Sequence, residues 1–169
     1  LIGAMEDIGE KFAQNKVFIP QVMAAAKTMI TSVDILKPWL AGSDISAKGR
    51  ICIGTVKGDH HNIGKNLVKI MLEGSGFEVI DLGTNVSAET FINTAKEKDC
   101  DIIALSALLT TTMGVMDETV KLAKSENIRA KIMIGGAPVT EDYRIKIGAD
   151  GYAPDAASAV TLAASLMNK

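Results

Sequence analysis

The sequence has few of the residues that cross-link or interrupt small folds. Its 169 residues include 2 cysteines, 4 prolines and 1 tryptophan. Cys52 and Cys100 form no CxxC pair, which excludes a disulfide framework and a cysteine-built zinc site. Both thiols lie in or beside apolar runs, so we expect them to be buried and inert. No apolar run approaches the roughly 18 residues that span a bilayer, and no signal peptide is recognisable.

An excess of charge of one sign is also lacking. The chain carries 18 Lys and Arg against 20 Asp and Glu, a formal net charge of −2. Binding to nucleic acid or to an anionic membrane needs a concentrated basic face, and the sequence has no run rich in Lys or Arg. We therefore expect no nucleic acid and no membrane among its partners, and a cytoplasmic location.

Short β-rich runs alternate with helical segments from Arg50 onward. The runs cover residues 50–56, 77–82, 101–106, 130–135 and 149–152, and the helices cover 63–74, 87–98, 112–126, 140–147 and 155–167, with Ser87 and Asp155 as N-caps. Nearly continuous apolar strands separated by helices are typical of a parallel sheet covered on both faces. The sequence thus predicts an α/β fold with a doubly wound, five-stranded parallel sheet. Its expected strand order is the flavodoxin-like, Rossmann-type order 2-1-3-4-5.

Residues 1–40 have a different pattern and predict a helical hairpin. Met5, Ile8 and Phe12 mark a first short helix, and a turn is expected at residues 15–16. The second helix has an apolar stripe at three- and four-residue steps, formed by Ile19, Val22, Ala26, Met29, Val33 and Leu36. Two helices alone enclose no core, so we expect this hairpin to pack on an α/β domain at 50–169, beyond a linker at 41–49. Because the chain begins with Leu1 inside the helical pattern, we expect the natural N-terminus to lie upstream.

Three loops carry the candidate functional residues, because open α/β sheets bind ligands beyond the carboxyl ends of their strands, at the switch point. These loops are residues 57–64, 106–112 and 135–138. In the first, Asp59 is spaced to accept the ring N–H of His61, which frees the other ring nitrogen as a base or metal ligand. An Asp-x-His pair is also common at solvated helix starts, so both interpretations stay open at this point.

Several kinds of site are excluded or weakened by what these loops do not contain. The first loop matches neither GxGxxG nor the Walker pattern. Adjacent histidines do not readily chelate one ion, and no third nitrogen or sulfur ligand stands in the other loops, which argues against a zinc hydrolase. A single imidazole suits a metal held by a macrocycle. The glycines at 135, 136, 148 and 151 would leave a slot for a long, flat ligand, although tight turns and close packing explain glycines equally well.

The pattern Asp59-x-His61-x-x-Gly64, followed by Ser106-x-Leu108 and then Gly135-Gly136, resembles the three-part signature of cobalamin-binding domains of the methionine synthase type. Corrinoid proteins of anaerobic methyltransferase systems share this domain. The resemblance covers nearly the whole chain, since residues 6–12 and 18–23 are similar to the second half of the family's four-helix cap. The histidine at 60 and the asparagine at 62 depart from the residues common in the family.

This resemblance implies that the chain binds cobalamin, as methylcobalamin or a related corrinoid, with the benzimidazole displaced and His61 as the lower ligand of the metal. It implies catalytic roles for His61, Asp59 and Thr112, with Thr112 extending a hydrogen-bond relay from Asp59. The other cofactor-binding residues it implies are Gly58, His60, Asn62, Ile63, Gly64, Ser106, Leu108, Thr110, Gly135, Gly136, Ala137, Ala156, and, from the cap, Phe12, Ile19 and Val22.

The function implied is that of a methyl carrier, which is a component of an enzyme system and not a complete enzyme. It would accept a methyl group from a substrate-specific methyltransferase and pass it to an acceptor methyltransferase that uses tetrahydrofolate or coenzyme M. A corrinoid-reactivating protein is a further implied partner. The alternatives are the cobalamin domain of methionine synthase, a mutase module and a cobalamin-binding sensor. The residues do not distinguish aryl methyl ethers, methylamines, methanol and methylthiols as methyl donors.

Overall fold

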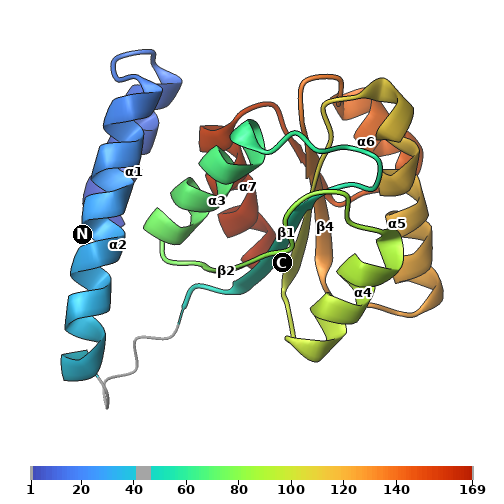
Figure 1. Ribbon diagram of the computed structural model, residues 1–169, viewed down its shortest axis with the longest axis horizontal. Coiled ribbons are helices and arrows are strands. Elements are labelled where there is room, and N and C mark those ends of the chain that lie inside the picture. The colour runs from blue at the N-terminus through green and yellow to red at the C-terminus, as the bar shows by residue number, and fades with distance from the viewer. Residues whose placement is uncertain (1, 41–46, 169) are drawn as a thin grey trace.

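The computed structural model describes residues 2–40 and 47–168, which form one parallel sheet flanked by helices (Figure 1). The strand order is β2-β1-β3-β4-β5, which confirms the predicted topology. Most of the predicted linker, residues 41–46, lies outside the described residues. The strands are β1 (Arg50–Thr55), β2 (Glu78–Asp81), β3 (Ile102–Ser106), β4 (Lys131–Gly135) and β5 (Gly151–Ala153).

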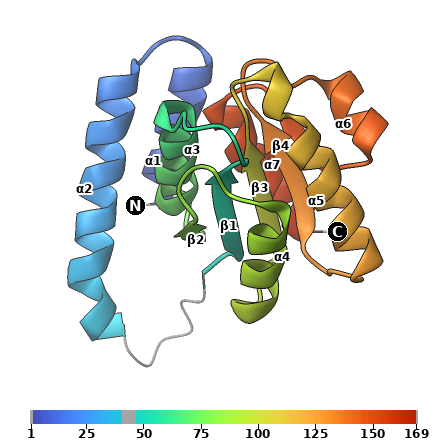
Figure 2. The same cartoon turned by 45° about the vertical axis from the view of Figure 1, so that its right-hand side comes forward.

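The helices cover both faces of the sheet. Those of the described chain are α1 (Ile2–Ala13), α2 (Ile19–Leu40), α3 (Ile63–Gly74), α4 (Ala88–Glu97), the 3-10 turn η1 (Thr110–Thr112), α5 (Gly114–Ser125), α6 (Glu141–Ile147) and α7 (Ala156–Met167). Helices α3 and α7 cover one face, and α4 and α5 the other (Figures 1 and 2). Both predicted N-caps are present, since Ser87 accepts from Thr90 N and Asp155 accepts from Ser158 N.

The fifth strand begins later than predicted. The expected run was 149–152, whereas β5 spans Gly151–Ala153. The preceding residues serve the end of α6, where Gly148 adopts a left-handed conformation with φ 71° and caps the helix. A glycine tolerates this conformation without strain, and the backbone N–H groups of residues 148 and 149 both bond back to Arg144 O. These two residues therefore close the helix, and the chain first pairs with β4 at Asp150, whose N–H donates to Ile132 O.

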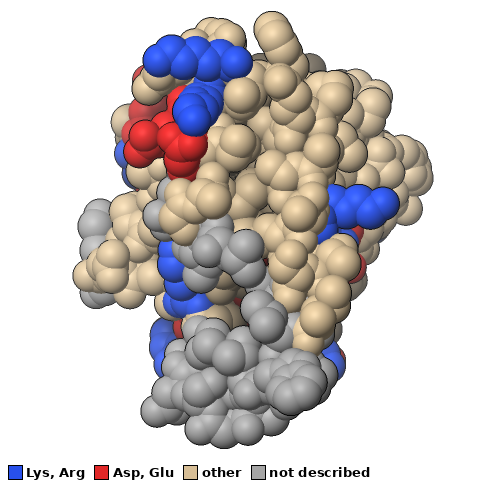
Figure 3. All heavy atoms as spheres, turned by 90° about the vertical axis from the view of Figure 1, so that its left-hand side faces the viewer, with Lys and Arg blue, Asp and Glu red and all other residues tan. Residues whose placement is uncertain are grey.

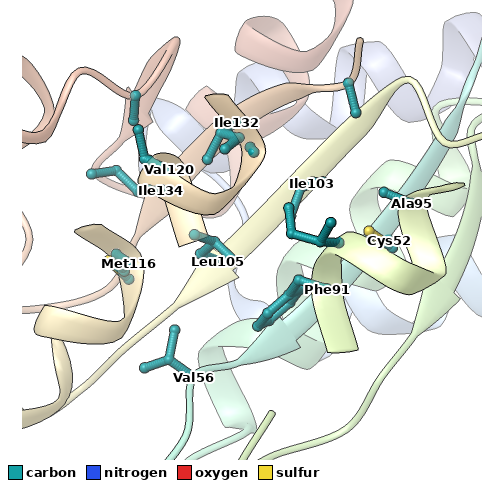
Figure 4. Packing of buried hydrophobic residues seen from close by; sticks show 14 of the residues in the cluster. Cys52, Val56, Phe91, Ala95, Ile103, Leu105, Met116, Val120, Ile132 and Ile134 are labelled. Atoms are coloured by element: carbon teal, nitrogen blue, oxygen red, sulfur yellow. The ribbon is translucent and has the colours of Figure 1, made fainter. Parts of the chain in front are cut away.

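Apolar side chains alternate between the two faces of the central strands. Cys52, Ile103 and Leu105 pack with Phe91 of α4 and Met116 of α5 (Figure 4), whereas their neighbours in sequence face α3 and α7. This alternation follows from the two-residue repeat of a strand. Both cysteines are buried and free, as predicted.

The hairpin of α1 and α2 packs on the layer formed by α3 and α7. Val22 is fully buried against Met71 and Ala156. The predicted stripe is wrong at its first position, because Ile19 is 46% exposed and close packing of α2 begins one turn later, at Val22. The side chains of residues 33 and 36 lie outside the described part. None of the described helices is both long and apolar enough to cross a membrane.

The outer face of the hairpin carries an uneven distribution of charge. Figure 3 shows Lys, Arg, Asp and Glu side chains gathered near the turn that joins α1 and α2, at the top of the view. Much of the remaining described surface on this face is uncharged. The exposed apolar side chains of this region include those of Phe18, Met23 and Ile35.

An ion pair between a buried lysine and a partly exposed aspartate ties the beginning of α3 to the edge of the sheet. The Lys65 side chain is 1% exposed, and its Nζ lies 2.6 Å from Asp81 Oδ1 and 2.8 Å from Asn66 Oδ1. Burial acts to raise the pKa of Asp81, but the hydrogen bonds from Lys65 and from Gly83 N outweigh it and hold that pKa below its usual range. The pair therefore positions the first turn of α3, directly after the loop at 57–62.

We expect Asp81→Asn to lower the free energy of unfolding by about 3 kcal/mol at neutral pH, because it leaves the buried Lys65 ammonium without a counter-ion. Because folding lowers the pKa of Asp81, its stabilising contribution is fully present above the unfolded-state pKa of about 3.9 and is lost as the pH falls further. In urea titrations the difference between wild type and variant should therefore shrink below about pH 4.

The matched control for this variant is Asp117→Asn. Asp117 forms an exposed i,i+4 pair with Lys121 at 2.7 Å, and its loss should cost less than about 0.5 kcal/mol. An Asp81→Asn variant no less stable than this control would contradict the structural role of the Lys65–Asp81 pair.

Candidate functional site

A cavity of about 640 Å³ opens at the carboxyl ends of the strands. It lies where the chain leaves β1 toward α3 on one face of the sheet and leaves β3 toward α5 on the other. The ends of β3, β4 and β5 contribute to its wall, α3 and α7 flank it, and Phe12 of α1 reaches it from the hairpin. The cavity thus occupies the switch point at which open α/β sheets bind ligands.

The carboxylate of Asp59 lies beneath this cavity and is completely buried. Its Oδ2 accepts hydrogen bonds from Leu108 N at 2.7 Å and Leu109 N at 3.1 Å. Its Oδ1 accepts from the backbone N of His61 at 3.0 Å and lies 2.7 Å from His61 Nδ1. Burial alone would raise the pKa of Asp59, but these hydrogen bonds outweigh it and hold the pKa well below its usual range. The carboxylate is therefore ionised at neutral pH.

The ring of His61 is oriented by this carboxylate and is open to the cavity. Its side chain is 53% exposed, and the backbone carbonyl of the same residue accepts from Thr55 Oγ1 at 2.8 Å. A proton on Nδ1, donated to Asp59, leaves the lone pair on Nε2. Among the described residues no protein partner is found for Nε2. This arrangement is typical of a histidine prepared as a metal ligand, with a carboxylate fixing its tautomer.

Thr112 lies beside Asp59, but its hydroxyl has a closer acceptor. Thr112 Oγ1 is 3.4 Å from Asp59 Oδ2 and 2.9 Å from Leu109 O. A hydroxyl has one proton, so the shorter contact to the carbonyl is the stronger hydrogen bond. The relay from Asp59 to Thr112 stays a prediction.

The structure brings most of the predicted site residues to the cavity. Those that line it are Phe12, His60, His61, Asn62, Ile63, Gly64, Ser106, Leu108, Gly135, Gly136, Ala137 and Ala156. Asp59 and Thr112 are buried below it. The cavity lining does not include Gly58, Thr110, Ile19 or Val22. Val22 is the clearest of these, because its side chain is fully buried between α2, α3 and α7 and has no surface left for a ligand.

Gly64 lines the cavity from the first turn of α3, and a Cβ added there would meet no heavy atom within 4 Å. Its backbone has no positive φ that would require glycine. The packing of the fold would therefore accept a larger residue at this position.

Other glycines near this edge of the sheet are required for different structural reasons. A Cβ on Gly136 would lie 1.9 Å from Ala107 O, and its φ of 127° excludes ordinary side chains. Gly151 instead makes room for Leu162, and Gly148 caps α6; neither lines the cavity. The predicted slot is thus bounded by Gly135, Gly136 and Ala137, and not by the two later glycines.

Three large apolar side chains at this edge of the sheet remain open to solvent. Ile63 is 85% exposed, Leu108 44% and Leu109 40%. The Lys and Asp side chains of the described lining make interactions of their own, since Lys65 pairs with Asp81 and Asp155 caps α7. A ligand that fits here would therefore meet mostly apolar side chains.

Sequence reasoning missed two of the groups that build the site. Thr55 is fully buried at the end of β1 and holds the His61 carbonyl. The sequence did contain a signal for Thr55, namely a polar residue at the end of an apolar strand. The second group is the backbone N–H of Leu109, which carries no sequence signal because any residue except proline supplies it.

These residues fit a metal held by a flat macrocycle. Within residues 2–40 and 47–168 there is no group of three or more His, Cys, Asp or Glu side chains able to hold a metal ion. One oriented imidazole and an apolar cavity would instead supply one protein ligand to such a metal and room for a ring. The donor set matches a metal whose remaining ligands belong to a cofactor.

Comparison with known proteins agrees with this geometry. The B12 binding domain family matches residues 49–161, and a second B12 binding domain family matches residues 1–37. The chain is 46% identical to dimethylamine corrinoid protein 3 of Methanosarcina mazei over 166 residues, which cover 96% of this chain and 99% of that protein.

Two solved structures resemble the chain over nearly its whole length. A cobalamin-binding protein from Desulfitobacterium hafniense matches with a TM-score of 0.81 and 36% identity, covering 96% of this chain and 77% of that one. The methanol:cobalamin methyltransferase complex MtaBC from Methanosarcina barkeri matches with a TM-score of 0.88 and 27% identity, covering 99% of this chain and 64% of that one. The chain therefore belongs to the B12-binding corrinoid protein family.

Proposed function

We propose that the chain is the corrinoid methyl carrier of a methylamine methyltransferase system. It accepts a methyl group on cobalt from a substrate-specific methyltransferase and delivers it to a second methyltransferase that uses tetrahydrofolate or coenzyme M. The observation that carries this proposal is the His61 ring, oriented by the buried Asp59 carboxylate and open to the cavity. The likeness to a dimethylamine corrinoid protein over 99% of its length supports a methylamine as the methyl source.

Bound cobalamin would supply a cobalt atom that can hold a methyl group and release it to an acceptor. In this proposal His61 Nε2 would be the protein ligand of that metal, and Asp59 would fix the tautomer that presents it. Gly64 would leave room for the ring, and Gly135, Gly136 and Ala137 would border the nucleotide tail of the cofactor. The hairpin in residues 1–40 serves as a cap on the α/β domain at 50–169.

The charges around the cavity favour a carrier over an enzyme that binds the amine itself. Lys65 and Asp155 are the acidic or basic side chains of the described lining other than histidine; Lys65 pairs with Asp81, and Asp155 Oδ1 accepts from Ser158 N at the start of α7. A methylammonium ion would find a single carboxylate there and no cluster of acidic side chains. Selection of the methyl donor therefore belongs to the partner methyltransferase, and a corrinoid-reactivating protein is a further expected partner.

Methyl transfer itself can be followed with purified partners. We expect the chain, loaded with cobalamin and reduced, to be methylated by a dimethylamine- or trimethylamine-specific methyltransferase in the presence of its amine. The visible spectrum reports this change directly. Methylation by a methanol-specific enzyme alone would contradict the assignment of the donor, and methylation by none of them would contradict the carrier function.

His61→Ala should remove the protein ligand of the metal. Cobinamide, which has no benzimidazole, is the suitable probe, because a resolved three-line splitting from a nitrogen outside the corrin ring in the EPR spectrum of its Co(II) state must then come from the protein. We expect wild type to show a three-line nitrogen splitting and the variant to lose it, with affinity reduced at least about tenfold. The neighbouring substitution His60→Ala is the control and should retain the splitting. Nitrogen splitting that persists in His61→Ala would contradict the assignment of His61 as the protein ligand of the metal.

Gly64→Ala should separate the needs of the cavity from those of the fold. Replacing a helical glycine by alanine raises the free energy of unfolding by up to about 1 kcal/mol. The new methyl group enters the cavity, so we expect the affinity for cobalamin to fall by about tenfold, or ~1.4 kcal/mol. Gly114→Ala is the control, since Gly114 also begins a helix and has no neighbour within 4 Å. Unchanged affinity in Gly64→Ala would mean that the ring does not pass this residue.

A further inference from the structure

We infer that Asn85 is a positioning residue for His61. It acts by holding the backbone of Gly58 and Asp59, which lie shortly before that histidine in the same loop. Asn85 lies in the loop between β2 and α4, remote in sequence from both histidines. The inference rests on the proposed role of His61 as the metal ligand. It adds a second loop to the support of that ligand, on the side of β1 opposite to the loop after β3.

Asn85 contacts the histidine loop twice. Its side-chain Oδ1 accepts a hydrogen bond from Gly58 N at 2.8 Å. Its own backbone N donates to Asp59 O at 3.0 Å. Asn85 thus holds both ends of the Gly58–Asp59 dipeptide, namely the backbone N–H of Gly58 and the backbone carbonyl of Asp59. These two hydrogen bonds limit how far the dipeptide can rotate or shift.

The loops around this contact are joined as an extension of the sheet. Thr55 N donates to Gly83 O, and Val86 N donates back to Thr55 O, both at 3.0 Å. Val56 and Val86 form an isolated parallel bridge. The backbone on both sides of Asn85 therefore continues the hydrogen-bonded pairing of β1 with β2. This pairing fixes the position of Asn85 itself.

The conformation of this contact restricts which residues can make it. Asn85 has φ 58° and Gly58 has φ 83°, so both adopt the left-handed region. Asparagine tolerates that region better than other residues with a side chain. Glycine would tolerate it too, but would lack the acceptor for Gly58 N. An asparagine or aspartate is thus the residue type that satisfies both the backbone and the hydrogen bond.

The effect on His61 follows from where Asp59 is held. Its carboxylate is fixed by N–H groups of Leu108 and Leu109 from the loop after β3. Its backbone is fixed from the other side by Asn85. Because the His61 ring takes its orientation from this carboxylate, a shift of the backbone at 58–59 changes the direction in which Nε2 points.

We expect removal of the Asn85 side chain to displace the His61 ring without unfolding the protein. Gly58 and Asn85 are both exposed, so water can satisfy Gly58 N when the side chain is removed. We therefore expect Asn85→Gly to fold normally and to misplace His61. Asn85→Asp keeps an acceptor oxygen and the tolerance for the left-handed conformation, and it should restore the positioning.

The experiment uses the full chain loaded with cobinamide and reduced to Co(II), with the nitrogen splitting in the EPR spectrum as readout. We expect Asn85→Gly to lower the fraction of cobalt with three-line splitting at least twofold, and Asn85→Asp to keep it at the wild-type level. The matched control is Asn127→Gly, since Asn127 has φ 52° at the end of α5 and does not contact the histidine loop. It should leave the fraction unchanged. Thermal unfolding of each variant measures the effect on the fold.

The outcomes separate this inference from the proposed function. The positioning role is supported if the splitting is lost in His61→Ala, is reduced in Asn85→Gly, and keeps its wild-type level in Asn85→Asp and Asn127→Gly. Splitting lost in His61→Ala but unchanged in Asn85→Gly overturns the role of Asn85 and leaves the ligand in place. Splitting that survives His61→Ala overturns the proposed ligand, and with it the role of Asn85. An equal reduction in Asn85→Gly and Asn127→Gly overturns the inference, because the effect would then follow from the backbone change alone.

Discussion

The buried carboxylate of Asp59 is the constraint on which the site depends. An ionised carboxylate without solvent contact costs several kcal/mol unless hydrogen bonds replace its water. Here the donors are two N–H groups from the loop after β3 and the backbone and ring nitrogens of His61. Because these donors come from separate segments, satisfying one charge fixes the distance between two loops and the direction of one imidazole together.

The parallel sheet supplies the geometry that this carboxylate requires. β1 lies between β2 and β3, so the loop that follows it has a neighbour on each side. The loop after β3 reaches the carboxylate, and the loop after β2 reaches the backbone. Farther along the sheet, the ends of β4 and β5 carry glycine and alanine, which leave a hollow instead of a packed surface. Support on one half of the edge and space on the other would suit the ring and the tail of the proposed cofactor.

Much of this arrangement could be predicted from the sequence, because it follows from local patterns. Continuous apolar strands gave the sheet, and Asp-x-His at the first strand end gave the pair at its switch point. Other features depend on contacts between distant segments. Val22 and Ile19 share one helical stripe, yet only packing against α3 and α7 decides that one is buried and the other exposed. Asn85 has no motif, since its importance lies in which loop the topology places beside it.

The glycines show the same limit in a different form. Gly64, Gly136 and Gly151 are indistinguishable as letters. The first leaves open space, the second avoids the Ala107 carbonyl, and the third admits Leu162. Sequence reasoning placed a slot near Gly136 and Gly151 and not near Gly64. The neighbours of each missing Cβ show which of these glycines the packing of the fold requires.

The apolar residues at the carboxyl edge have a consequence for the life of the protein in the cell. Ile63, Leu108 and Leu109 present apolar surface to water. Exposed apolar patches mark interaction sites or become aggregation liabilities. If the proposed cofactor lies against Ile63 and Leu108, which line the cavity, its insertion would also shield newly made protein from self-association.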